Sequence, residues 1–343
     1  MTEETMRVLR YHGHPKLHFE ELPVPEPGEK WVRIRPISVG IDGTDAHVLK
    51  GEFPVLIPIV PGHEIAGVVE KTGPGVTTLK QGDLITVEPH EYCGTCRYCR
   101  IGKEHLCLDK KAFGFHLNGG LAEAMIVPEK VAYLLPDGIG PDVGCMTEPV
   151  ACCVHALDRL QPVPGLSLMV FGAGTAGLIL IKLASLSGLS PIIAIEPQLD
   201  RREMALNFGA DVVFDPNETR WRDKALQLTG QEGFDFIIDA VGSGHILEDA
   251  IQMTARGARL LVFGVATPED TASLNPYEIF RKELSIIGTV INPYTHYRAV
   301  QLLPKLGLEN LPAHKFPLNE YEGAYEMLGR GGKVIITPQE ETY

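Results

Sequence analysis

The 343-residue sequence predicts an α/β protein in which an irregular β-barrel is joined to a doubly wound parallel sheet. Two observations support this fold class. Residues 1 to about 135 are rich in Pro, Gly and short β-branched runs bounded by turn signals. From about Leu166 onward, short and nearly continuous apolar runs alternate with helical stretches, as in strands that are buried on both faces.

The first domain is expected to consist of short extended segments. Trp31–Ile37 and Glu64–Glu70 are the clearest of these, and the turn sequence Gly73-Pro74-Gly75 follows the second. The composition therefore favours a barrel with irregular connections.

Six apolar runs predict the strands of the parallel sheet: Leu168–Phe171, Ile192–Ile195, Val212–Phe214, Phe236–Ile238, Leu260–Phe263 and Leu284–Ile287. An uncharged stretch, Leu160–Ile181, is broken by prolines, glycines and serines. We interpret it as a buried strand, turn and helix and not as a membrane span.

The tail of the chain after about Asn292 leaves the strand and helix alternation and ends in Gly332–Ile336, which is typical of a strand returning to the first domain. We predict one domain from residues 1–152 with 292–343 and a second from residues 153–291. A continuous helix, from Glu148 to about Leu160, is expected at the boundary, because no long polar linker separates the halves.

Charge and the N-terminal sequence limit the function classes. The formal net charge is -13, so the average surface would not attract a nucleic-acid backbone or an anionic membrane. The first five residues are polar or acidic and lead into no apolar core of a signal peptide. We expect a cytoplasmic protein with a small-molecule substrate.

Four of the seven cysteines, Cys93, Cys96, Cys99 and Cys107, form a Cys-x2-Cys-x2-Cys-x7-Cys cluster. Such spacing allows one loop to wrap a tetrahedral metal ion with four thiolates. Zinc is the favoured ion, with an iron-sulfur cluster as the alternative. Four thiolates leave no open position for a substrate, so this metal would be structural.

A glycine-rich turn follows the first predicted parallel strand. Gly172, Gly174 and Gly177 form Gly-x-Gly-x-x-Gly, with Thr175 and Ala176 between them, and an apolar helix follows. The turn predicts a dinucleotide site with the pyrophosphate at the helix N-terminus. Glu196 ends the next strand, where a carboxylate can hold the adenosine ribose hydroxyls and favour NAD, whereas Arg201 and Arg202 leave NADP as the alternative.

Three further segments suggest a second metal site: Gly40–His47, Pro61–Glu64 and Glu148-Pro149. Together with the cysteine cluster and the glycine turn, in this order, they closely resemble the zinc-containing medium-chain alcohol dehydrogenases over nearly the whole chain. The resemblance implies a GroES-like catalytic domain and a Rossmann cofactor domain. It also implies two zinc ions per chain, one structural and one catalytic, and hydride transfer to NAD(P)+.

In that family the catalytic metal is held at the positions of Asp42 and His63, with a carboxylate at Glu64 or Glu148 completing the set. Position 42 is usually cysteine, whereas this chain has aspartate. Aspartate is a competent zinc ligand but a harder and weaker donor than thiolate, so we expect weaker zinc binding. The alternative is that Asp42 only caps a turn. The resemblance also assigns a proton relay to Thr44 and His47.

Polyols and sugars are the expected substrates, because the aspartate at position 42 resembles the sorbitol, arabinitol and glucose dehydrogenase branches. A threonine dehydrogenase-like oxidation is the enzymatic alternative, and a non-catalytic NAD(P)-binding sensor is the alternative from another class. Relatives are usually dimers or tetramers, so a homodimer or homotetramer is expected, with the apolar edge Leu284–Gly288 between copies. Candidate pocket residues are Phe115, His116, Asn118, Asn292, Tyr294 and His296.

Overall fold

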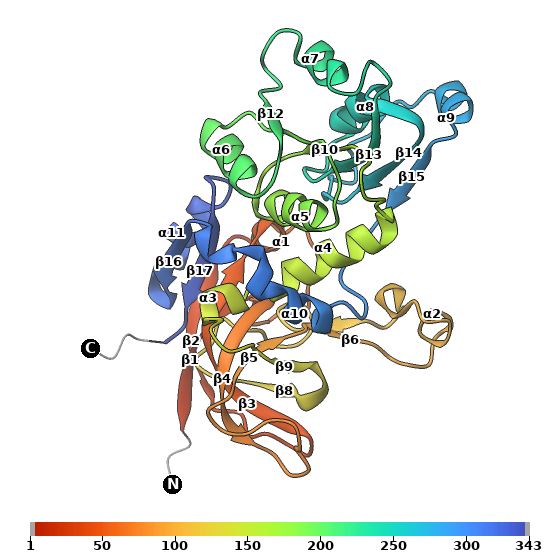
Figure 1. The fold of residues 1–343 in the computed structure, drawn as a ribbon. Coiled ribbons are helices and arrows are strands. Elements are labelled where there is room, and N and C mark those ends of the chain that lie inside the picture. The colour runs from red at the N-terminus through yellow and green to blue at the C-terminus, as the bar shows by residue number, and fades with distance from the viewer. Residues whose placement is uncertain (1–3, 340–343) are drawn as a thin grey trace. The chain divides into compact units, whose positions relative to one another are not determined.

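In the computed structural model, which describes residues 4–339, the chain divides into two units. One unit comprises residues 1–151 and 293–343, and the other comprises residues 152–292. Helix α4 (Thr147–Leu160) crosses this division, in agreement with the helix predicted there. Figure 1 shows the two units as a ribbon.

The second unit is built on a six-stranded parallel sheet in the order β12-β11-β10-β13-β14-β15. Counted along the unit, this is the 3-2-1-4-5-6 order of the Rossmann fold, so the predicted doubly wound sheet is confirmed. The strands are β10 (Leu168–Phe171), β11 (Ile192–Ile195), β12 (Val212–Phe214), β13 (Phe234–Asp239), β14 (Thr254–Val262) and β15 (Ser285–Gly288). Strand β15 lies at one edge, as expected for Leu284–Gly288.

Helices cover this sheet and bury its strands. Helix α5 (Thr175–Leu186) packs on β10 and β11, and α8 (Gly244–Gln252) packs on β13 and β14. Every residue of β10 and of β11 is buried, which explains why these strands have unbroken apolar sequences. The remaining helices are α6 (Leu199–Asn207), α7 (Trp221–Gln227) and α9 (Pro276–Lys282).

The first unit contains a seven-stranded sheet in the order β16-β17-β3-β4-β5-β9, with β8 also paired to β3. Its strands are β3 (Trp31–Ile41), β4 (Glu64–Thr72), β5 (Leu84–Val87), β8 (Met125–Pro128), β9 (Ala132–Leu134), β16 (Ala313–Pro317) and β17 (Lys333–Thr337). Strand β17 pairs antiparallel with β3, so the tail of the chain joins the sheet of the first unit. Figure 1 shows β16 and β17 in blue, and β17 is the one that pairs with β3.

Smaller elements complete the first unit. They are the hairpin strands β1 (Thr5–Tyr11) and β2 (Leu17–Pro23), the pair β6 (His90–Glu91) and β7 (Lys111–Ala112), and the helices α1 (Gly43–Leu49), α2 (Arg97–Arg100), α3 (Pro141–Gly144), α10 (His296–Leu306) and α11 (Tyr321–Met327). Among the described residues, apolar clusters form its core, and one of them joins residues of β1, β3 and β17. The core therefore fixes the ends of β3 and β17, where the candidate site lies.

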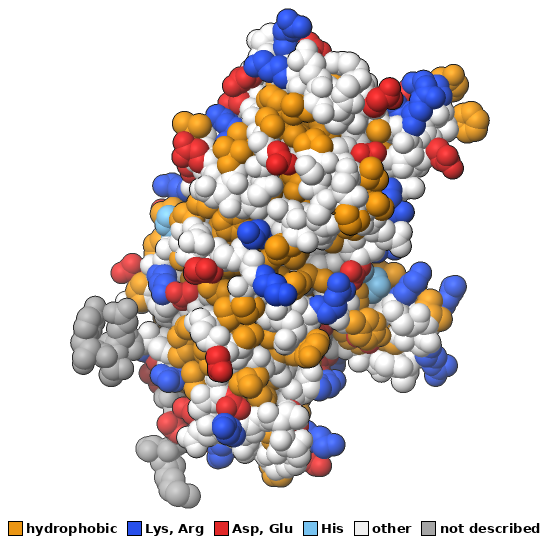
Figure 2. Space-filling view, in the orientation of Figure 1, with side chains coloured by type: hydrophobic (Ala, Val, Ile, Leu, Met, Phe, Trp, Pro, Cys, Tyr) orange, Lys and Arg blue, Asp and Glu red, His pale blue; other side chains and the backbone are white. Residues whose placement is uncertain are grey.

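The molecular surface is mixed in charge. Figure 2 shows Lys and Arg side chains interspersed with Asp, Glu and hydrophobic side chains on the face that it draws. Among residues 4–339, no helix has both the length and the apolar character needed to cross a bilayer.

Candidate functional site

Three paired strands of the first unit bring the candidate metal ligands together. Gly40 of β3 is paired with Glu64 at the start of β4 on one side and with Ile335 of β17 on the other. Asp42 directly follows β3, and His63 directly precedes β4. Residues separated by more than twenty positions in the sequence therefore meet because strand pairing fixes their register.

Asp42 is the N-cap of helix α1. Its carboxylate accepts hydrogen bonds from the backbone N–H groups of Thr44 at 2.8 Å and Asp45 at 3.2 Å, and the Asp45 carboxylate accepts one from the Asp42 N–H at 3.1 Å. This reciprocal arrangement is a capping box. Asp42 thus does cap a turn, and its second oxygen, Oδ2, still faces His63.

The His63 ring lies between two carboxylates. Its Nε2 is 4.0 Å from Asp42 Oδ2, and its Nδ1 is 3.6 Å from Asp45 Oδ1. Both distances are too long for a good hydrogen bond, and the first approaches the spacing of about 3.4 Å between two ligands at about 2.05 Å from one tetrahedral zinc ion. Phe115 packs on the ring, with 5.0 Å between centroids. This leaves Nε2 turned toward Asp42 and Nδ1 toward a carboxylate that can orient the ring.

Glu64 and Lys333 form an ion pair inside the first unit, and both side chains are almost completely buried. Burial raises the pKa of Glu64 to about 7, although the Lys333 charge opposes this. Burial lowers the pKa of Lys333, but the Glu64 and Asp42 charges outweigh it and raise the pKa overall.

Charge neighbours also hold the pKa values of Asp42 and His63 away from their ordinary values. Burial raises the pKa of Asp42, but the His63 and Lys333 charges outweigh it and lower that pKa overall. Burial lowers the pKa of His63, but Asp45 first and then Asp42 and Glu148 outweigh it, so that the pKa is raised well above 6.5. These neighbouring charges therefore stabilise the negative form of Asp42 and the positive form of His63.

Ligand atoms of Asp42, His63 and Glu64 all lie within 4.8 Å of one another. Two carboxylates and one imidazole are donors that zinc accepts, so the residues present fit a zinc ion. Glu148, in the first turn of α4, is buried close enough for its charge to act on His63 and Glu64, but it is not part of this tight group.

The proposed relay residues lie on helix α1, three positions apart. The Thr44 hydroxyl donates to Asp42 Oδ2 at 3.3 Å, which brings it to the candidate ligands Asp42, His63 and Glu64, called the metal group below. The His47 ring is bonded through Nδ1 to Glu52 Oε2 at 2.6 Å and is partly exposed. The structure therefore places Thr44 against the metal group and gives His47 a different partner.

The four cysteines of the cluster converge around one point. Their sulfur atoms lie 3.6 to 3.9 Å apart in the pairs Cys96 and Cys99, Cys93 and Cys99, and Cys96 and Cys107. Four thiolates at about 2.3 Å from a tetrahedral zinc ion would be about 3.8 Å apart. All four are free thiols, and backbone N–H groups of Thr95 and Cys96 lower the pKa of Cys93 to about 6. The loop therefore fits the predicted four-thiolate zinc site.

The glycine turn lies between β10 and α5 of the second unit, with Gly174 as the helix N-cap. Gly172 has a φ of +91°, which favours glycine, and a Cβ on Gly177 would lie 2.1 Å from the Gly172 carbonyl oxygen. A Cβ on Gly174 would meet nothing within 4 Å. The turn thus packs tightly on its own helix and leaves open space at the N-cap, which fits a bound pyrophosphate next to Thr175 and Ala176.

Glu196 follows β11 and is buried. Its carboxylate accepts hydrogen bonds from the Ala173 N–H at 2.9 Å and the Gln198 N–H at 3.0 Å. Since each carboxylate oxygen can accept a second bond, Glu196 keeps the capacity to bind ribose hydroxyls. Its neighbours Arg201 and Arg202, on α6, are both partly buried.

Arg202 is tied back to the protein. Its Nη1 donates to the carbonyl oxygens of Glu196 at 2.8 Å and Pro197 at 2.7 Å, and to Asp215 Oδ2 at 3.1 Å. A guanidinium held in this way is less available to a ligand phosphate.

The candidate pocket residues differ in their contacts and in how deeply they are buried. Phe115 contacts His63, whereas the Asn118 side chain accepts a backbone bond from Val60 at 3.2 Å. His296 is fully buried in the first unit beside the Tyr133 ring at 4.9 Å, and burial lowers its pKa to about 3. The remaining candidates are a half-buried His116, a fully buried Asn292 and an exposed Tyr294.

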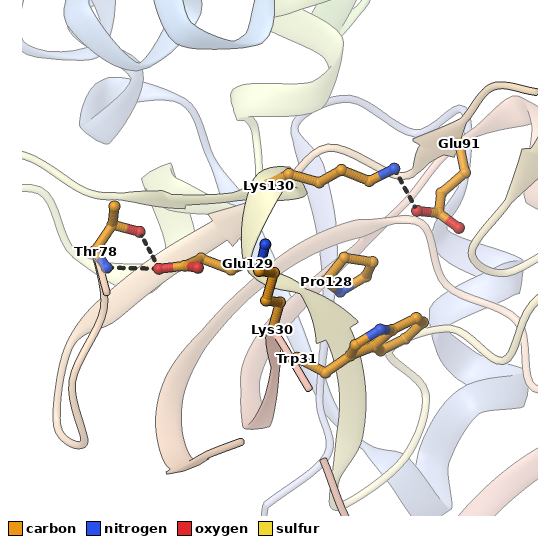
Figure 3. Close-up of a pocket in the computed structure, with 7 residues that line it drawn as sticks. All are labelled: Lys30, Trp31, Thr78, Glu91, Pro128, Glu129 and Lys130. Atoms are coloured by element: carbon orange, nitrogen blue, oxygen red, sulfur yellow. Dashed lines mark hydrogen bonds and ion pairs between the residues drawn. The ribbon is translucent and has the colours of Figure 1, made fainter. Parts of the chain in front are cut away.

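A cavity of about 570 Å³ opens elsewhere on the first unit, as Figure 3 shows. Trp31 and Pro128 line it, together with Lys130, which pairs with Glu91 at 3.1 Å. None of the predicted ligands, relay residues or cofactor residues lines this cavity. Cavity size therefore does not identify the functional site here.

Two residues that bear on the site were not found from the sequence. Lys333 precedes an ordinary apolar run and belongs to no motif, and Asp215 follows a strand without any binding signature. Only the register of β17 against β3 and the packing beside β12 show what they contact.

Comparison with known proteins agrees with the family resemblance of the sequence. Residues 28–137 match the model of the alcohol dehydrogenase GroES-like domain, and residues 176–305 match that of the zinc-binding dehydrogenase. The chain is 32% identical to L-threonine 3-dehydrogenase of Pyrococcus horikoshii, over 98% of this chain and 99% of the relative. It is 30% identical to sorbitol dehydrogenase of Halalkalibacterium halodurans, over 96% and 98%.

A solved structure extends this similarity to the whole fold. It is described as a zinc-binding dehydrogenase from Sinorhizobium meliloti 1021 bound to NADP, and it matches with a TM-score of 0.94 at 28% identity. The match covers 98% of this chain and 100% of that one. The likeness therefore includes both units described above.

Proposed function

The chain belongs to the zinc-containing medium-chain alcohol dehydrogenase family and is an NAD(P)-dependent alcohol dehydrogenase, and from this premise we propose that it oxidises a secondary alcohol of a polyol or sugar. The observation that carries the proposal is the tight group of Asp42, His63 and Glu64, in which no thiolate takes part. The two relatives named above are a threonine dehydrogenase and a sorbitol dehydrogenase, so the family alone leaves the substrate open.

The proposed roles follow from the positions of the side chains. Asp42 and His63 would hold the catalytic zinc, with Glu64 or Glu148 completing the set. A zinc ion bound there would act as a Lewis acid that lowers the pKa of a substrate hydroxyl, and a bound NAD(P)+ would be the hydride acceptor. Asp45, 3.6 Å from His63 Nδ1, would orient the ring, and Phe115 would keep water from one of its faces.

The substrate proton needs an acceptor, and Thr44 is the first candidate. Its hydroxyl donates to Asp42 Oδ2 in the structure, and in the relay it would turn its own proton toward the next carrier as it accepts the proton of the substrate. His47 would be the next carrier, after its ring leaves Glu52. Removal of the imidazole by His47→Asn should therefore slow turnover less than loss of a metal ligand.

Charge supports a neutral hydroxylated substrate. Asp42, Asp45, Glu64 and Glu148 surround His63, and the one lysine described in this group is already paired with Glu64. Hydroxyl groups can donate to such carboxylates, whereas the α-carboxylate of threonine would meet like charge. Threonine is kept as the second candidate because of the similarity to L-threonine 3-dehydrogenase, and its ammonium group would suit the same acidic surroundings.

The further parts of the proposal concern stoichiometry and assembly. The four-cysteine loop and the Asp42 group would each hold one zinc, giving two per chain. Strand β15 lies at the edge of the parallel sheet, where a strand of a second copy could pair with it, which supports a dimer or tetramer.

The panel that tests the substrate comprises polyols, aldoses and L-threonine, each assayed with NAD+ and NADP+. We expect a polyol or sugar to give the highest kcat/KM and chelation to abolish the activity. A clear preference for L-threonine would overturn the substrate class and leave the family assignment intact. The absence of turnover on the whole panel, with cofactor still bound, would favour a sensor.

NAD is the proposed cofactor, because Glu196 repels a 2′-phosphate and Arg202 is held by Asp215. In Asp215→Ala, we expect the loss of this ion pair to strengthen NADP+ binding by Arg202 roughly 1.4- to fivefold, the effect of one partly exposed ion pair of ~0.2–1 kcal/mol. NAD+ binding should change little. Calorimetric Kd values of both nucleotides measure this.

Asp223→Ala is the matched control, since it breaks the ion pair of Asp223 with Arg220 at 3.1 Å and changes the net charge equally. If NADP+ binds no more tightly to Asp215→Ala than to this control, Arg202 does not face the 2′-phosphate.

A further inference from the structure

A buried lysine meets the candidate metal group from the far end of the chain. Lys333 opens β17, and the register of β17 with β3, and of β3 with β4, brings it to Glu64. Its ammonium pairs with Glu64 Oε2 and donates to the Ile41 carbonyl at 3.3 Å. The side chains of Lys333 and Glu64 are only 4% and 1% exposed, so this charge pair is fixed inside the unit.

The backbone leaves space for this pair at Gly40. A Cβ on Gly40 would lie 1.9 Å from Glu64 Oε2 and 2.7 Å from Lys333 Cε. The φ of Gly40 is not in the left-handed region, so glycine is required here for space and not for conformation. The strand that leads to Asp42 is thus shaped around the Glu64 and Lys333 side chains.

The Glu64 carboxylate can therefore bind either of two cations, the Lys333 ammonium or a metal ion. Glu64 lies within 4.8 Å of the ligand atoms of Asp42 and His63, and it is also paired with Lys333. An ammonium so close to a divalent ion repels it, and the burial of the Lys333 and Glu64 side chains limits the screening of the two charges by solvent. The Lys333 charge also acts on Asp42.

We propose that Lys333 is a positioning residue that competes with the catalytic metal ion for Glu64 and so keeps this carboxylate out of the resting ligand set. The inference rests on the proposed metal site but not on its substrate. Asp42 and His63 then hold the ion together with Glu148 or solvent. Glu64 lies close to the ion but does not bind it in the resting state. Lys333 thereby weakens metal binding at a site that already lacks a thiolate.

The test is a double-mutant cycle on metal affinity. Zinc is removed from the weaker site with a chelator, and the whole enzyme is titrated with Co2+, whose visible absorption reports its ligands. The variants are Lys333→Met, Glu64→Gln and the two together. We expect Lys333→Met to raise Co2+ affinity roughly 10- to 100-fold, the range over which groups beside a metal site change affinity.

The double variant separates competition from simple repulsion. If Lys333 acts only by its charge, Lys333→Met raises the affinity equally whether or not Glu64 has been replaced. Competition predicts that most of the gain disappears in the background of Glu64→Gln, and that the Co2+ spectrum changes only while Glu64 is present. An equal gain in both backgrounds, or a loss of affinity in Lys333→Met, would overturn the inference.

Further variants guard against misfolding. Lys333→Arg keeps the positive charge and should leave the Co2+ affinity close to that of the parent, and Lys333→Gln is measured if Lys333→Met does not fold. Lys315→Met is the matched control, because Lys315 pairs with Asp142 on the same unit and does not contact the metal group. Thermal melts confirm folding, and the affinities stand whether or not the enzyme oxidises a polyol.

Discussion

Loss of His63 is expected to abolish turnover while the fold remains. For His63→Ala we expect kcat/KM to fall by at least about a thousandfold, because a Lewis acid contributes several kcal/mol to the barrier and each ~1.4 kcal/mol is tenfold in rate. NAD+ binding should persist, since Glu196 and the glycine turn belong to the second unit. Steady-state kinetics, calorimetry with NAD+ and metal content per chain measure the three effects.

Asp42 needs a more careful substitution, because it is both a candidate ligand and the cap of α1. Asn caps a helix about as well as Asp, whereas Ala costs about 1 kcal/mol at such a position. Asp42→Asn should therefore keep the melting temperature but lower activity and metal content, and Asp42→Ala should lower all three. A fully active Asp42→Asn enzyme would assign Asp42 to capping alone.

His314→Ala provides the control for the histidine variant. His314 is a partly buried histidine of the same unit that is not one of the candidate ligands, and its Nε2 is hydrogen-bonded to the Gly331 carbonyl oxygen at 3.1 Å. The His314→Ala variant should have a slightly lower melting temperature and nearly unchanged activity. Equal losses in His314→Ala and His63→Ala would indicate that general destabilisation, and not a missing ligand, removes the activity.

Removal of one thiolate from the cysteine loop should have the largest effect on stability. Cys107→Ser is expected to lose one zinc per chain and to melt at a clearly lower temperature, because four-thiolate sites of this kind contribute on the order of 10 kcal/mol of apparent binding energy to folding. Metal analysis and thermal melts measure both. Cys153→Ser, a buried thiol outside the loop that donates to the Ala176 carbonyl at 3.6 Å, should keep its zinc content.

Graded chelation distinguishes the two metal sites without mutation. Thiolates bind zinc more strongly than carboxylates and imidazole, so activity should fall at a lower chelator concentration than the melting temperature does. Simultaneous loss of activity and stability would contradict the assignment of one tight structural ion and one weaker catalytic ion.

Much of the fold could be predicted because its signals are local. The strands of the parallel sheet are buried on both faces, so their apolar runs stand out, and the predicted Ile192–Ile195 and Val212–Phe214 match β11 and β12 residue for residue. The longer β3 was only partly predicted. It continues to Ile41 because β17, some 290 residues later, pairs with its end.

In the candidate site, too, some parts could be predicted from local sequence and others depend on contacts between distant residues. Local spacing was sufficient for the cysteine loop and the glycine turn, since each wraps its ligand with one short segment. The dual role of Asp42 was visible in the sequence only as two alternatives. The structure shows a capping carboxylate with one oxygen still facing His63, so the two roles are compatible.

The sequence by itself determined the parts whose chemistry lies in consecutive residues: the thiolate loop, the dinucleotide turn and the order of strands and helices. Only the tertiary structure decided which side chains share a charge environment. Lys333 reaches Glu64 and Asp215 holds Arg202 through strand register and packing, and no residue near them in the sequence encodes those contacts. The physical reason is that metal affinity and cofactor preference depend on charges that are close in space, whatever their separation along the chain.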